Sequence, residues 1–206
     1  MLNELILSAV RSELNFYISG KRITHTLAVE SEAVRLGQLF SLTNEDILQL
    51  RLAALLHDIT KEKNLEEQIL LCDRFGYQYT ENDIACPKVF HSVTGAFLAR
   101  EVYGEFVSDI VFDSIRFHTT GRPAMSMFEK LIYLADYIEE TRTFPDCTKL
   151  RTIFYDTDNF TEQHLNKVLV TSYDMTISNL IEERKQIHPL TISARNFLLA
   201  KGTFYD

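Results

Sequence analysis

The sequence predicts an all-α protein built as a single helical bundle. Apolar residues recur at the spacing of an α-helix along nearly the whole chain, beginning with Leu2, Ile6 and Val10. The alternation of apolar and polar residues that marks a half-buried strand is hard to find. The 206 residues are 46% hydrophobic and 24% charged, which is typical of one globular domain with a substantial core.

Periodicity and a capping signal place the first three helices. The N-terminal apolar stripe is followed by a second stripe that contains Leu27 and Leu36. The clearest helix start comes next, because Thr43 can cap a helix and Asp46 stands at the capping-box spacing, with its carboxylate in the first turn. The apolar run behind this start predicts a helix that ends near His57.

Glycine, proline and small polar residues divide the remaining chain into segments of ordinary helix length, which predicts about eight to ten helices in all. A long run from 161 to 185 is expected to form one helix, and 192–200 a shorter final one. No linker, repeat or shift in composition indicates a second domain within residues 1–206. The breaks lie at Ser19-Gly20, Phe75-Gly76, Cys86-Pro87, Gly104, 120–123, Phe144-Pro145 and His188-Pro189.

Charge and cysteine content exclude several classes of protein. The formal net charge of -8 opposes sequence-independent binding of nucleic acid, although a local basic pocket could hold a small phosphate compound. The three cysteines form no CxxC pair, which favours free thiols in a reducing compartment. Polar residues interrupt the N-terminal apolar stripe, so we expect no signal peptide or membrane span and a cytoplasmic location.

Ionisable residues follow two strongly apolar runs. Residues 53–56 lead directly into His57 and Asp58, and residues 131–135 lead into Asp136. An unpaired carboxylate would be costly to desolvate there, whereas a cation can neutralise it and also accept imidazole nitrogen. A single histidine at a helix end is more often a cap or a core residue than a ligand. The combination on separate helices, with His25 at the start of another apolar stripe, favours a metal site.

The order of His25, His57-Asp58 and Asp136 is the signature of the HD superfamily of metal-dependent phosphohydrolases. The chain resembles, more narrowly, the branch of symmetrical bis(5'-nucleosyl)-tetraphosphatases, and the resemblance runs from about 22 to 196. The segments that carry it are RITHTL around His25, RLAALLHDITK around His57 and Asp58, HSVTGAFLAR from His91, IRFHTTGRPAMS around His118, KLIYLADYIE around Asp136 and IHPLTISARN near the end.

This resemblance implies an HD-domain helical bundle with a two-metal site, in a ligand-bearing core of about 20–142 followed by C-terminal helices of about 146–201. Iron is the expected metal, and manganese, cobalt or zinc would also suit the nitrogen and oxygen donors. One metal would take His25, His57, Asp58 and Asp136; Asp58 would bridge to a second metal that takes His91 and His118.

The activity implied is the symmetrical hydrolysis of diadenosine tetraphosphate to two ADP by metal-bound hydroxide. Two alternatives remain open: an HD nucleotidase or phosphodiesterase acting on a smaller or cyclic nucleotide, and a non-catalytic nucleotide-sensing module. The expected partner is a small dinucleoside polyphosphate or nucleotide, with no nucleic acid and no membrane, and a homodimer is plausible.

Basic and polar residues beside the expected ligands are candidates for phosphate contacts. Lys61 follows Asp58 by three residues and could act on a phosphate oxygen or the leaving group, or else be an exposed lysine in a charged run. The segment after His118 offers hydroxyls and a guanidinium, although it also suits a plain turn. Arg142 resembles the arginine after this family's LADYIE segment, but Glu140 replaces the usual proline. The predicted contacts are Arg22, Lys61, Thr119, Thr120, Gly121, Arg122 and Arg142.

Two other histidines are expected to lie outside the metal site. His164 is in a polar stretch and is expected to be solvated. His188 precedes a proline, where a structural hydrogen bond or a contact to an adenine base would serve equally well.

Overall fold

The computed structural model describes residues 1–202, and within them every regular element is a helix, as predicted. There are eleven α-helices, one more than the upper expectation, because the five residues of α5 are too few to show an apolar period, although Thr80 and Asp83 form a capping box at its start. The α-helices are α1 (Glu4–Glu13), α2 (Gly20–Leu39), α3 (Asn44–Leu56), α4 (Leu65–Arg74), α5 (Glu81–Ala85), α6 (Phe90–Tyr103), α7 (Asp109–Phe117), α8 (Met127–Ile138), α9 (Pro145–Tyr155), α10 (Glu162–Glu182) and α11 (Pro189–Ala200). Three 3-10 turns add η1 (Leu14–Phe16), η2 (Pro87–Val89) and η3 (Gly104–Phe106).

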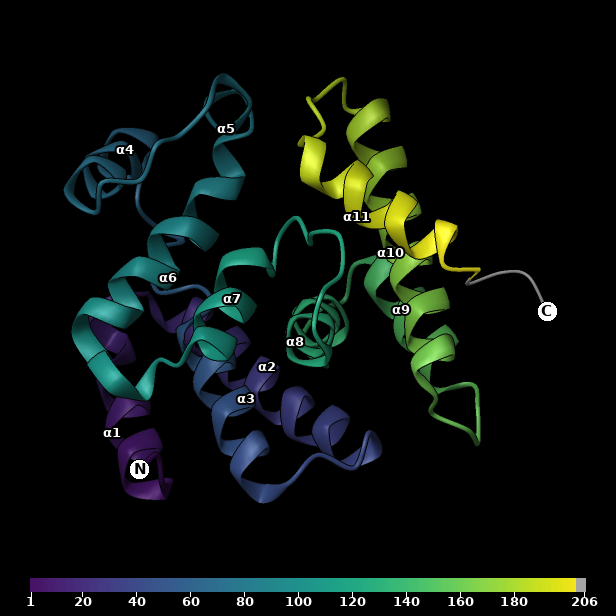
Figure 1. Ribbon diagram of the computed structural model, residues 1–206, viewed down its shortest axis with the longest axis horizontal. Helices are drawn as coiled ribbons and strands as arrows, with labels where there is room; N and C mark the ends of the chain where they lie inside the picture. The colour runs from purple at the N-terminus through teal and green to yellow at the C-terminus, as the bar shows by residue number, and fades with distance from the viewer. Residues whose placement is uncertain (203–206) are drawn as a thin grey trace.

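Helix α8 lies in the middle of the arrangement (Figure 1). It packs against α2, α3 and α7 on one side and against α9 and α10 on the other. One continuous buried cluster runs from Leu7 in α1 to Leu198 in α11. The central position of α8 explains why its residues 131–135 are all apolar, since both of its sides are covered.

Helix α3 forms as the sequence predicts. The Thr43 hydroxyl accepts a hydrogen bond from the amide of Asp46, and His57 is the residue at the C-terminal cap. Residues 52–56 are completely buried, so the end of this helix is held in the core. That packing carries His57 and Asp58 into the interior of the protein.

The predicted breaks at Pro145 and Pro189 are the first residues of α9 and α11. Proline is favoured at that position because its missing amide hydrogen has no partner in the first turn. Helix α11 therefore starts at Pro189, three residues before the expected 192, and the long helix predicted within 161–185 is α10. In the described part of the chain, no helix is both long and apolar enough to cross a membrane.

Candidate metal centre

The six side chains predicted as ligands lie together inside the bundle. They come from α2, the end of α3, the first turn of α6, the end of α7 and α8. Three overlapping groups of three have ligand atoms within 4.8 Å of one another. These groups are His25, His57 and Asp58; His57, His118 and Asp136; and Asp58, His91 and His118.

Each of the four histidines has its Nδ1 facing an oxygen that accepts a hydrogen bond. Nδ1 of His57, His91 and His118 donates to the carbonyl oxygens of Ala54, Lys88 and Ile115, at 2.6, 2.7 and 2.6 Å. Nδ1 of His25 lies 3.1 Å from Oε1 of Glu139. Carbonyl oxygens only accept, so a neutral His57, His91 or His118 carries its proton on Nδ1 and leaves the lone pair on Nε2 for the interior.

Two of these lone pairs face each other. Nε2 of His91 lies 3.0 Å from Nε2 of His118. Burial lowers the pKa of both imidazoles, that of His91 to about 3 with the Lys61 ammonium adding to the effect, so the rings are neutral near pH 7. Two neutral acceptors at this distance repel each other, and a cation that both nitrogens can coordinate removes the repulsion.

The carboxylate of Asp58 lies between two sets of histidines. Its Oδ2 is 3.5 Å from Nε2 of His57 and 3.7 Å from Nε2 of His25. Its Oδ1 is 3.2 Å from Nε2 of His91 and 3.6 Å from Nε2 of His118. One carboxylate oxygen is therefore directed to each set, which is the arrangement that a bridging ligand requires.

Charged neighbours keep both aspartates ionised, although Asp58 is buried and Asp136 is largely covered. Burial by itself raises the pKa of Asp58, but its neighbours, among them the Lys61 ammonium, outweigh burial and hold the pKa well below its usual value. For Asp136 the opposing charge is the Arg142 guanidinium. Burial also disfavours the charged form of His25, yet Asp136 and Glu139 together raise its pKa to about 9.

Polar atoms of the cluster lack hydrogen-bond partners. Among the described residues, Nε2 of His57 and Oδ1 of Asp58 are buried and make no hydrogen bond. Such orphaned acceptors are costly unless a cation binds them. Imidazole nitrogens with carboxylate oxygens, and no thiolate, form a donor set for a divalent transition metal, so the residues present fit a metal.

A family model for the HD domain matches residues 22–141. The chain belongs to the HD domain family. HD domains are metal-dependent phosphohydrolases, which agrees with the donor set described above.

Relatives of this HD protein match it over nearly the whole chain. It is 31% identical over 202 residues to the symmetrical bis(5'-nucleosyl)-tetraphosphatase of Bacillus subtilis strain 168, covering 97% of this chain and 99% of the relative. It is 34% identical to the enzyme of the same name from Halalkalibacterium halodurans, covering 89% and 91%. A crystal structure from Clostridium acetobutylicum, of a predicted HD superfamily hydrolase involved in NAD metabolism, matches with 37% identity and a TM-score of 0.84, covering 94% and 97%.

Three cations among the predicted phosphate contacts reach the HD site. The Arg22 guanidinium donates to Oδ2 of Asp58 at 2.9 Å, and that of Arg142 donates to Oδ1 of Asp136 at 2.5 Å. The Lys61 ammonium lies 3.0 Å from Nε2 of His91 and 3.7 Å from Oδ1 of Asp58. Lys61 is thus turned inward from its charged run, and all three cations border the aspartates.

The segment after His118 divides into two parts. The Thr119 hydroxyl lies 3.3 Å from Nε2 of His91 and 3.2 Å from Nε2 of His118, so it borders the site. The Thr120 hydroxyl, in contrast, is buried and bonded to the carbonyl oxygen of Gly121. A phosphate contact for Thr120 stays a prediction.

Gly121 and Arg122 have structural contacts. Gly121 has a φ of 64°, and a Cβ built on it would lie 1.9 Å from the hydroxyl oxygen of Tyr173. The Arg122 guanidinium donates to Asp113 at 2.9 Å and to the buried Glu129 at 2.6 Å. The hydroxyl-rich turn therefore has its shape fixed by packing, and phosphate binding by these two residues stays a prediction.

Sequence reasoning missed Glu139 as a part of the site. Its side chain is completely buried, and its Oε1 is the acceptor for Nδ1 of His25. It also accepts hydrogen bonds from the amide of Thr141 at 2.6 Å and from the Thr141 hydroxyl at 2.8 Å. The available signal was a carboxylate directly after the apolar run of α8, three residues beyond Asp136.

The two remaining histidines have structural roles. His164 is partly buried rather than solvated, because its Nε2 donates to the carbonyl oxygen of Phe154 at 2.8 Å. Nε2 of His188 lies 3.1 Å from Oδ1 of Asp83, and its Nδ1 accepts from the amide of Leu190 at 3.2 Å. Both ring nitrogens of His188 are therefore used within the protein.

Proposed function

We propose that this protein hydrolyses dinucleoside tetraphosphates, diadenosine tetraphosphate above all, symmetrically to two ADP. Two relatives named for this activity align with 89% or more of the chain. The observation that carries the proposal is the buried cluster of six side chains with its orphaned acceptor atoms. The small-nucleotide and sensing alternatives have no observation of their own in their favour.

We assign the cluster to two metal ions, with iron as the resident metal and manganese, cobalt or zinc as substitutes. His25, His57, Asp58 and Asp136 would hold one ion, and Asp58, His91 and His118 the other. The two oxygens of Asp58, each directed to a different set of histidines, support this division. When bound, the metals supply a water of lowered pKa and positive charge for the phosphoryl oxygens.

The chain's own cations would hold the polyphosphate. Arg22, Lys61 and Arg142 now contact Asp58 or Asp136, so their charges lie at the rim of the cluster. A tetraphosphate brings several negative charges to a protein whose net charge is -8, and attraction must therefore come from local cations. Thr119 would add a hydroxyl donor beside His91 and His118, and Lys61, 3.0 Å from Nε2 of His91, would give a proton to a leaving phosphate oxygen.

The test is the incubation of anaerobically iron-loaded protein with diadenosine tetraphosphate, followed by separation of the nucleotides. The proposal predicts ADP as sole product. It predicts no turnover by Asp58→Ala and an unchanged rate for the control His164→Ala, whose ring bonds to the carbonyl oxygen of Phe154. AMP with ATP as products would contradict symmetrical cleavage, and no reaction of a metal-loaded sample would contradict the proposed substrate.

A further inference from the structure

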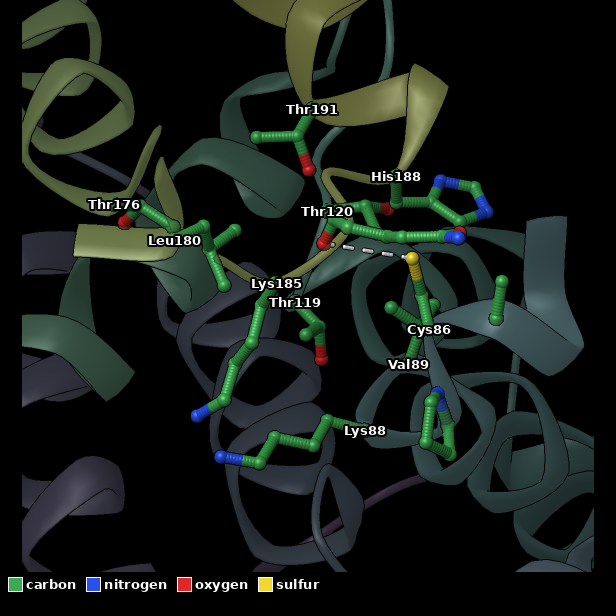
Figure 2. A pocket seen from close by; sticks show the side chains of 13 residues that line it. Cys86, Lys88, Val89, Thr119, Thr120, Thr176, Leu180, Lys185, His188 and Thr191 are labelled. Atoms are coloured by element: carbon green, nitrogen blue, oxygen red, sulfur yellow. Dashed lines mark hydrogen bonds between the residues drawn. The ribbon is translucent and has the colours of Figure 1, made fainter. Parts of the chain in front are cut away.

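A cavity of about 470 Å³ adjoins the metal centre and has no part in the functions assigned so far. One wall is formed by the end of α5 and by η2, and the other by α10 and the turn that leads to α11. Thr119 and Thr120 from the turn after α7 also line it, as Figure 2 shows.

The cavity touches the centre at two points. Thr119 lines the cavity, and its hydroxyl lies 3.2 and 3.3 Å from the Nε2 atoms of His118 and His91. Lys88 also lines the cavity, and its carbonyl oxygen accepts the Nδ1 hydrogen of His91. A molecule in the cavity would therefore have one end beside His91 and His118.

The chemistry of the cavity changes from its walls to its rim. The walls are largely apolar, with Ala85, Val89 and Leu180 among them. The rim carries two exposed lysines, Lys88 and Lys185, whose side chains extend to the same side as the Thr119 hydroxyl in Figure 2. The Lys185 ammonium forms an exposed ion pair with Glu183, which a phosphate can replace. Apolar walls suit a flat base and its ribose, and lysines at the rim suit the phosphates that follow.

The two walls are joined by side-chain contacts. His188 and Asp83 form a buried pair at 3.1 Å, and the Cys86 thiol donates to the carbonyl oxygen of Gln186 at 3.7 Å. These pairs connect segments about a hundred residues apart in the sequence, so the cavity is formed before any ligand arrives. Since both ring nitrogens of His188 are engaged, recognition of a base falls to the other lining groups.

We propose that this cavity binds one nucleoside of the substrate, with its phosphates running past Lys88, Lys185 and Thr119 to the metal centre. The size agrees, because pockets for small ligands generally enclose about 300–1,000 Å³. The proposal rests on the proposed function for the identity of the ligand. It adds a nucleoside site that the six clustered side chains do not provide.

The test uses a matched pair of tryptophan variants. Leu180→Trp fills the cavity, whereas Ile181→Trp places the same side chain at a neighbouring position that is 62% exposed and not part of the lining. The probes are ADP and inorganic pyrophosphate, whose dissociation constants are measured by calorimetry on metal-loaded protein. We expect Leu180→Trp to raise the dissociation constant of ADP at least tenfold and that of pyrophosphate less than twofold. We expect Ile181→Trp to change neither constant.

Equal weakening of ADP and pyrophosphate, or unchanged ADP binding by Leu180→Trp, would overturn the assignment. If Leu180→Trp does not fold, Ala85→Trp, at an exposed position in the opposite wall of the same cavity, replaces it. Binding needs no turnover, so the two proposals can fail separately. If the wild-type protein and the two variants bind ADP as expected but the wild-type protein does not cleave diadenosine tetraphosphate, the proposed function alone is refuted.

Discussion

Replacement of Glu139 by glutamine should weaken metal binding without changing the fold. Oε1 of Glu139 accepts from Nδ1 of His25 and from the Thr141 hydroxyl, and its other oxygen accepts from the Thr141 amide. Glutamine has a single oxygen, so its NH₂ group must face either the His25 ring or the Thr141 amide. Either outcome leaves two donors opposed in a site that excludes water, because the side chain is 0% exposed.

The loss of such a partner behind a ligating histidine costs about 10- to 100-fold in metal affinity. That range corresponds to about 1.4–2.7 kcal/mol. The assay is competition between the protein and a chelator for manganese, with the midpoint of thermal unfolding of the metal-free protein measured alongside. The matched control is Glu140→Gln, since Glu140 is the exposed neighbour in the same turn. Metal affinity of Glu139→Gln within twofold of the control would refute the positioning role of Glu139.

Three predictions concern the surroundings of the site. Gly121→Ala should destabilise the protein by more than about 2 kcal/mol in chemical unfolding, because its Cβ meets Tyr173 at a positive φ; a smaller loss would contradict the packing argument. Arg122→Ala should lower stability by about 1–3 kcal/mol with KM unchanged, because it leaves Glu129 buried without its cation; a raised KM at normal stability would instead support phosphate binding. Asp83→Asn should be less stable than wild type at neutral pH. Burial opposes ionisation of Asp83, but hydrogen bonds from its neighbours hold its pKa below the usual 3.8, so its stabilisation is present above about pH 4 and is lost as pH falls through the lowered pKa. A difference between the two proteins that stays constant down to pH 2 would exclude this linkage.

Local signals in the sequence were sufficient for most of the fold. Thr43 begins α3 as predicted, since a capping side chain acts on amides only three residues away. Pro145 and Pro189 begin helices for an equally local reason. Helix α5 was missed because five residues are too few to show a period.

Part of the cluster could be expected from the residues themselves, because His57, Asp58 and Asp136 directly follow apolar runs, whereas His91 and His118 were expected only from the resemblance to the HD family. The support around the cluster depends on contacts that no local pattern records. His25 and Glu139 are 114 residues apart, and Asp83 and His188, which join the walls of the cavity, are 105 apart. The direction of the Arg122 side chain also depends on a neighbouring helix, because its guanidinium donates a hydrogen bond to Glu129 of α8.

Metal counting tests most directly whether the six side chains form a two-metal centre bridged by Asp58. Protein loaded anaerobically with iron(II) and freed of excess metal is analysed for iron per chain, beside Asp58→Ala prepared in the same way. We expect two iron ions per wild-type chain and loss of the bridged pair in the variant. One iron per wild-type chain, or two in Asp58→Ala, would contradict a two-metal centre bridged by Asp58.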